Sequence, residues 1–159
     1  MSTQTELDQE TAQAIPVLAE DVGVWDGEAE IRTGPGAPPM RHKAMTTYRL
    51  VGGRWLTLDY KADSGFEGHG VYGWDPTKRK YAGIWVDSMQ TTIARGEGTW
   101  DPATRTATYT FETMGPNGIV RYRETIERPD RDTRIYRNLM PGRDGTEFEM
   151  IHVVHKRRK

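Results

Sequence analysis

Two titratable residues far apart in the sequence, Glu124 and His152, are candidates for proton transfer to a bound molecule. In the strand predicted over residues 118–127, alternation places Glu124 on the apolar side with Tyr122, opposite a charged side that must face water. In the strand predicted over 146–155, the same argument places His152 inward. Burial would raise the pKa of the glutamate, and a nearby carboxylate would favour the protonated histidine. The two side chains could act as general base and acid, or could simply hold two strands in register.

A third candidate catalytic residue is Asp87, in the segment Trp85-Val86-Asp87-Ser88. An inward carboxylate would supply a proton acceptor to a small-molecule site. The alternative is a structural role, in which Asp87 bonds a turn or Arg54 near one end of the fold.

Histidine spacing argues against a native metal site. His152 and His155 are three positions apart, so on a strand their rings point to opposite faces and cannot share a metal. The chain has no cysteine, which excludes thiolate ligands, thiol catalysis and disulfides. We therefore expect neither a metal nor a cofactor. A haem-binding barrel stays open as an alternative, in which an inward His152, with Met150 on the same face, ligates the iron.

The elements that must position these residues are predicted to be almost entirely β-strands. Turns built on glycine, or on aspartate followed by proline, recur along the chain at roughly 8–12 residues, the spacing of a sandwich or barrel. One short helix is predicted over residues 6–22, broken or kinked at Pro16. Strands are predicted at residues 23–32, 42–50, 54–61, 66–74, 80–90, 92–100, 105–113, 118–127, 133–140 and 146–155. About ten sequential strands close most readily as an all-β, antiparallel up-and-down barrel.

Four sequence motifs carry a resemblance to a known family. They are Gly23-Val24-Trp25, then Leu50-Val51-Gly52-Gly53-Arg54-Trp55-Leu56, then Phe66 to Asp75 followed by Trp85-Val86-Asp87-Ser88. The chain after residue 15 resembles a bacterial family of uncharacterised function with a lipocalin-like, calycin-type barrel. The resemblance implies a barrel and no common activity. His69, His152 and His155 lie outside its pattern.

The interior of such a barrel is expected to hold one small ligand. Inward tyrosines, tryptophans and methionines are the expected ligand-binding residues: Tyr48, Tyr60, Tyr72, Trp74, Trp85, Met89, Tyr109, Tyr122, Tyr136 and Met150. In the strand over 80–90, which is apolar on both faces, we place Trp85, Asp87 and Met89 inward. We expect Ile84 and Val86 to pack under the helix.

Composition limits the kinds of partner that the protein is expected to bind. The net charge of −1 argues against nucleic-acid binding, and no apolar run has the length of a membrane span. Residues 1–10 do not resemble a signal peptide, so we expect a cytoplasmic protein. We expect a single domain over residues 1–159, with flexible tails at 1–5 and 156–159. The sequence leaves a homodimer open.

These observations favour a protein that binds an apolar or aromatic small molecule inside a barrel. General acid/base chemistry without a cofactor would make it a cyclase, isomerase or lyase of the dehydratase type, acting on a molecule like a secondary metabolite. The alternatives are a carrier or sensor without catalysis, and the haem-binding barrel.

Overall fold

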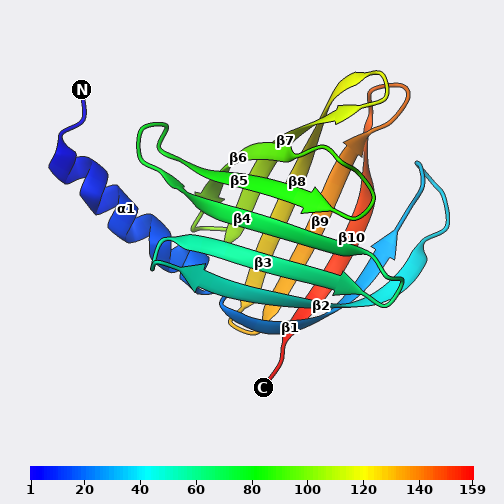
Figure 1. The fold of residues 1–159 in the computed structure, drawn as a ribbon, viewed down its shortest axis with the longest axis horizontal. Coiled ribbons are helices and arrows are strands. Elements are labelled where there is room, and N and C mark those ends of the chain that lie inside the picture. The colour runs from blue at the N-terminus through cyan, green and yellow to red at the C-terminus, as the bar shows by residue number, and fades with distance from the viewer.

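The ten predicted strands are present and close into one antiparallel barrel. The computed structural model describes residues 1–159. Its elements are α1 (Gln4–Ala19), β1 (Gly23–Ile31), β2 (Met40–Val51), β3 (Trp55–Ala62), β4 (Glu67–Asp75), β5 (Lys80–Asp87), β6 (Ala94–Asp101), β7 (Thr106–Gly115), β8 (Gly118–Asp130), β9 (Thr133–Pro141) and β10 (Glu147–Arg157). Each strand pairs with its sequence neighbours, and β1 pairs with β10 to close the barrel (Figure 1). The predicted all-β, up-and-down barrel with a short N-terminal helix is confirmed.

Aspartate side chains form the tight turns at the Asp-Pro pairs. The Asp75 Oδ1 atom accepts a hydrogen bond from the backbone N–H of Thr77 at 2.9 Å. Asp101 makes the equivalent bond at the β6–β7 turn. Each turn contains an arginine in the left-handed backbone region, Arg79 at φ 53° and Arg105 at φ 51°. Local turn chemistry therefore sets these two hairpins.

The helix α1 begins at a capping box. Thr3 accepts a hydrogen bond from the Glu6 backbone, and the Glu6 carboxylate accepts one from Thr3. The helix continues through Pro16 to Ala19, so the expected break is wrong. Proline removes one hydrogen bond to the preceding turn, and packing against the barrel holds the last turn in place. No helix in the structure is long and apolar enough to cross a bilayer.

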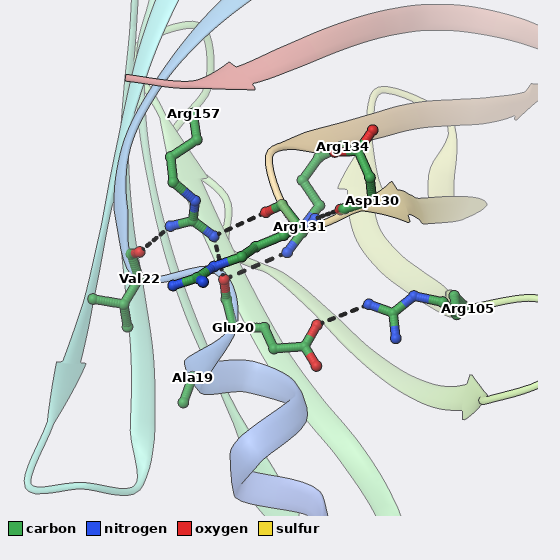
Figure 2. Close-up of a pocket in the computed structure, with 8 residues that line it drawn as sticks. All are labelled: Ala19, Glu20, Val22, Arg105, Asp130, Arg131, Arg134 and Arg157. Carbon is green, nitrogen blue, oxygen red and sulfur yellow. Dashed lines mark hydrogen bonds and ion pairs between the residues drawn. The ribbon is translucent and has the colours of Figure 1, made fainter. Parts of the chain in front are cut away.

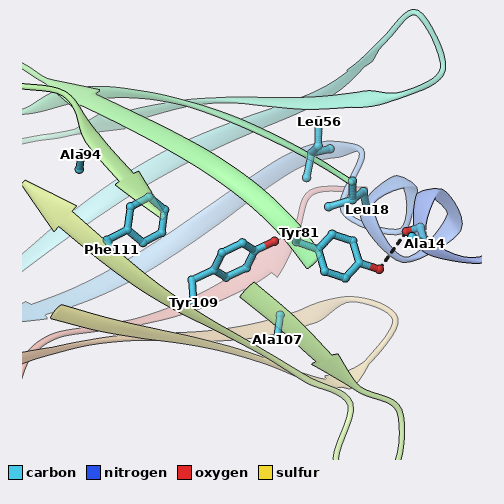
Figure 3. Close-up of a cluster of buried hydrophobic side chains, with 8 residues drawn as sticks. All are labelled: Ala14, Leu18, Leu56, Tyr81, Ala94, Ala107, Tyr109 and Phe111. Atoms are coloured by element: carbon cyan, nitrogen blue, oxygen red, sulfur yellow. Dashed lines mark hydrogen bonds between the residues drawn. The ribbon is translucent and has the colours of Figure 1, made fainter. Parts of the chain in front are cut away.

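One end of the barrel is covered by α1, and we call it the helix end (Figure 1). Ala14 and Leu18 are buried there in a cluster that includes Leu56 and Tyr81. The Tyr81 hydroxyl donates a hydrogen bond to the backbone oxygen of Ala14 at 3.1 Å (Figure 3). The helix is thus fixed to the barrel by burial and by a polar contact.

Aromatic rings lie in the interior next to inward-facing glycines. A Cβ atom built at Gly98 would lie 2.5 Å from the Tyr109 ring, and one at Gly96 would lie 2.7 Å from the Phe111 ring. Phe111 is completely buried, and both rings lie between the barrel walls (Figure 3). The core is therefore aromatic, with glycine on β6 making room for the rings.

The outer face of β5 is exposed to solvent. Ile84 and Val86 are 40% and 39% exposed, so the prediction that they pack under α1 is wrong. The helix covers the barrel end instead of the side of β5. Trp85 faces inward as predicted, over Gly68. Met89 does not, because β5 ends at Asp87 and leaves Met89 80% exposed in the following loop.

The C-terminal residues are part of the barrel. Lys156 and Arg157 belong to β10, and Lys156 Nζ donates to Thr133 Oγ1 at 2.7 Å. The backbone N–H of Arg158 donates to the Val24 carbonyl oxygen at 2.7 Å. Residues 156–158, part of the expected tail, therefore bond to neighbouring strands through their backbone and side chains.

A bulge in β10 reverses the inward face of its C-terminal half. The register with β9 shifts between Glu149 and Ile151. Beyond the shift Val153 and His155 are buried, while His152 forms an ion pair with Glu149 at 3.2 Å on the outer side. One extra residue moves every later side chain to the opposite face. The prediction that His152 faces inward is therefore wrong, and His155 takes the inward position.

Candidate functional site

Glu124 on β8 lies inside the barrel and is 6% exposed. The Tyr136 hydroxyl on β9 donates a hydrogen bond to Glu124 Oε1 at 2.7 Å. Asn138 on β9 and Tyr109 on β7 are its direct cross-strand partners. Burial raises the pKa of Glu124 to about 7, although hydrogen bonds from Tyr136 and Asn138 lower it. At neutral pH the carboxyl can therefore both donate and accept a proton.

Five tyrosines from five strands lie around Glu124, and we call them the tyrosine cluster: Tyr48, Tyr72, Tyr109, Tyr122 and Tyr136. Burial is the main cause that raises the pKa of each hydroxyl, and the charge of Glu124 raises it further. The rings of Tyr72 and Tyr109 meet edge-on at 5.4 Å, and Tyr122 stacks on Phe111 at 5.7 Å. The hydroxyls stay protonated at physiological pH and can donate hydrogen bonds to a polar group of a ligand.

Several polar atoms inside the barrel have no hydrogen-bond partner. They are Thr46 Oγ1, Trp74 Nε1, Asn138 Oδ1 and His155 Nδ1. Burial lowers the pKa of His155 to about 4, so its ring is neutral at pH 7. Unpaired buried polar atoms are uncommon in native proteins, and they are often met by water or a ligand. The interior is therefore chemically suited to a guest with polar groups.

The Asp87 side chain bonds only to nearby residues of β5 and of the loop after it. Its Oδ2 atom accepts a hydrogen bond from Trp85 Nε1 at 2.9 Å, and its Oδ1 atom accepts one from the backbone N–H of Met89 at 2.9 Å. Gln90 Nε2 also donates to Oδ2, at 3.3 Å. These bonds orient the indole of Trp85 and fix the start of the β5–β6 loop.

The remaining predicted ligand-binding residues are dispersed. Trp74 meets Tyr81 edge-on at 5.0 Å near the helix end, and Tyr60 meets Phe66 edge-on at 5.9 Å on β3 and the loop after it. Met150 lies within the β10 bulge and is partly buried. The structure thus gathers the tyrosine cluster around Glu124 but does not bring Met89 or His152 to it.

His152 lies outside the barrel. It lines a groove of about 480 Å³ together with Glu30, Arg41 and His42. His42 pairs with Asp63 at 3.5 Å. As the odd spacing predicts, His152 and His155 point to opposite faces. The haem alternative required His152 inside the barrel, and the β10 bulge removes that arrangement. No cluster of three or more histidine, aspartate or glutamate side chains is arranged to hold a metal ion.

A buried ion-pair group at the helix end was missed by sequence reasoning. Asp21, just after α1, bonds Arg128 Nη2 at 2.8 Å and Arg134 Nε at 2.7 Å, and all three side chains are at most 8% exposed. Trp25 is completely buried and lies under Arg134, whose Cζ is 4.8 Å from the ring centre. Alternation along β8 could have indicated the buried position of Arg128, because this residue follows Glu124 by four positions and therefore faces the same side of the strand.

A polar cleft of about 550 Å³ opens beside the helix end (Figure 2). Four arginines contribute to its lining: Arg105, Arg131, Arg134 and Arg157. The Glu20 carboxylate pairs with Arg105 at 3.1 Å, and the Glu20 backbone oxygen accepts a hydrogen bond from Arg157 at 2.7 Å. Much of the positive charge is therefore already bonded to the protein.

The fold and interior define a class of small, helix-capped, up-and-down β-barrels with a buried carboxyl group among aromatic side chains. The chain belongs to the family described as "Protein of unknown function (DUF1579)", whose model matches residues 10–157. No curated protein matches the chain.

Two solved structures share the barrel fold. Rv2717c from M. tuberculosis aligns over 92% of this chain and 98% of its own, with a TM-score of 0.67 and 14% identity. The S-type phycobiliprotein lyase CPES from Guillardia theta aligns over 100% of this chain and 99% of its own, with a TM-score of 0.58 and 11% identity. At these identities the similarity concerns the fold.

Proposed function

We propose that the protein binds a small apolar or aromatic molecule inside the barrel and acts on it by proton transfer through Glu124. The observation that carries this proposal is the buried Glu124 carboxyl, bonded by Tyr136 at 2.7 Å and with a pKa raised to about 7 by burial. A carboxyl group that titrates near the working pH is suited to general acid/base catalysis.

The reaction class follows from the groups available. Glu124 supplies a proton donor or acceptor, and protonated tyrosine hydroxyls can stabilise a developing oxyanion. Cyclisation, isomerisation and elimination of water need no other protein group than these. One solved structure with this fold is named a phycobiliprotein lyase, which is in keeping with chemistry on a small molecule.

The ligand is sought first, by native mass spectrometry of the protein incubated with cell extracts. Turnover of the captured molecule is then compared between the wild type and Glu124→Gln. We expect the variant to lose about 10²–10⁴-fold in rate with little change in affinity, because glutamine keeps the shape and the Tyr136 contact but cannot transfer a proton. Glu112→Gln is the matched control, since Glu112 is exposed and pairs with Arg121 on the outer face.

A carrier or sensor without catalysis is the competing function. It predicts the same captured ligand, no conversion by the wild type, and at most a small affinity change in Glu124→Gln. Equal turnover by wild type and Glu124→Gln would also overturn the assignment of Glu124.

A further inference from the structure

Arg128 on β8 is buried while only part of its guanidinium group is bonded. Its side chain is 3% exposed, and Nη2 donates to Asp21 Oδ2 at 2.8 Å. The Nε and Nη1 atoms are both buried and have no hydrogen-bond partner. The Trp100 ring covers one face, with its centre 4.7 Å from Cζ. N–H groups that have lost water and gained no acceptor are costly, most of all on a charged group.

The buried ion-pair group also lacks one negative charge. Asp21 is a single carboxylate shared by Arg128 and Arg134. Arg134 places its other N–H groups on backbone oxygens, including that of Thr133 at 2.8 Å. The neighbouring carboxylate, Glu20, pairs with a third arginine near the surface. One positive charge is therefore left without a counter-ion, and the unbonded nitrogens belong to Arg128.

We propose that Arg128 binds the carboxylate of the molecule held in the barrel, so that the ligand is an aromatic or otherwise apolar carboxylic acid. This inference rests on the proposed function and names its substrate class. A carboxylate brings the single negative charge that the ion-pair group lacks, and charge-assisted hydrogen bonds to a guanidinium are among the strong ones.

The position of Arg128 relative to Glu124 sets the length of the ligand. The two residues are on the same face of β8 and four positions apart, a span of about 13 Å at 3.3 Å per residue. Tyr109 lies close to both residues. Burial is the main cause that raises the pKa of the Tyr109 hydroxyl, the charge of Arg128 lowers that pKa, and the charge of Glu124 raises it. If the ligand carboxylate binds Arg128, the ligand atoms roughly 10–13 Å from that carboxylate would therefore lie beside the Glu124 carboxyl.

The test compares naphthaleneacetic acid with the corresponding naphthaleneethanol, which differ in the carboxylate. Binding of each to the full chain is measured by calorimetry at pH 6, where the acid is ionised and Glu124 is largely protonated. We expect the wild type to bind the acid about 10- to 100-fold more tightly than the alcohol. Arg128→Met should lose this preference and keep the affinity for the alcohol. Arg121→Met, on the exposed outer face, should keep both.

A crystal structure of the wild type with naphthaleneacetate gives a second measurement that does not depend on a variant. We expect the carboxylate within hydrogen-bond distance of Arg128. A carboxylate bound elsewhere, equal affinities of the wild type for acid and alcohol, or a preference that persists in Arg128→Met would each overturn the inference. Tight binding of both probes without preference leaves interior binding intact, whereas binding of neither counts against the proposed function as well.

Discussion

At the scale of single residues, Glu124 and His155 are buried in the same barrel and respond to pH in opposite senses. Burial raises the pKa of Glu124 from 4.5 to about 7 and lowers that of His155 from 6.5 to about 4. Both groups are therefore neutral in the folded protein over much of the range between these values. Unfolding restores the ordinary pKa of each and makes stability depend on pH.

Glu124→Gln is expected to change the pH dependence of stability in a defined direction. Above pH 4.5 the unfolded chain releases the Glu124 proton while the folded chain keeps it, so this residue's contribution is lost as pH rises through about 7. The variant should match the wild type at pH 4.5 and become more stable than it by about 2–4 kcal/mol at pH 8. Urea unfolding across this pH range measures the difference; a difference that is constant with pH would contradict the raised pKa.

His155→Gln provides the opposite comparison in the same measurement. The folded protein keeps His155 neutral while the unfolded chain binds a proton below pH 6.5, so its contribution to stability is lost as pH falls from 6.5 toward 4. The variant should lack this loss. In the wild type the two pH dependences of stability partly cancel between pH 4.5 and 6.5. Glu124→Gln therefore exposes the dependence due to His155, and His155→Gln exposes the dependence due to Glu124.

At the scale of elements, turns and alternation predicted the strands but not their irregularities. Asp75 and Asp101 set hairpins where the sequence indicated them, because their side chains bond the turn backbone locally. Glu124 faced inward as predicted, because β8 is regular around it. His152 did not, because the bulge after Glu149 depends on pairing with β9, which no local pattern reveals. Arg128 was missed because the predicted strand ended one residue too early.

Glycine at inward positions of β6 is a requirement of this barrel. Gly98→Ala would place its Cβ 2.5 Å from the Tyr109 ring, so the ring or the strand must shift. We expect a loss of about 1–3 kcal/mol in the free energy of unfolding, measured by chemical denaturation. Gly34→Ala is the matched control, because nothing lies within 4 Å of its Cβ. Equal stability of the two variants would mean that Tyr109 is not packed on β6.

At the scale of the whole molecule, Asp21 joins α1 and β1 to β8 and β9 at the helix end. It follows α1, precedes β1, and bonds arginines on β8 and β9. The backbone oxygen of Asp21 also accepts a hydrogen bond from Trp25 Nε1 at 2.8 Å. This one residue therefore fixes the helix and the first strand against strands from the opposite end of the sequence.

Asp21→Asn is expected to destabilise the fold strongly, because it leaves two buried guanidinium groups without a carboxylate. The expected loss is about 3–5 kcal/mol, measured by thermal and chemical unfolding. Glu97→Gln is the comparison, since Glu97 pairs with exposed lysines and should cost less than about 1 kcal/mol. If the two changes cost the same, the ion-pair group at the helix end does not hold the molecule together.

The pairing of β1 with β10 determines when the barrel can close during synthesis of the chain. Nine of the ten strand pairs join consecutive strands, so hairpins can form as the chain leaves the ribosome. Gly27 on β1, by contrast, pairs with His155 on β10 and can do so only after β10 has been synthesised. Until the last eleven-residue strand is synthesised, β1 presents an open edge and the tyrosine cluster is open to water. The closed barrel interior therefore forms only after β10 has been synthesised, and a chain that lacks β10 would have the other nine strands without a closed barrel.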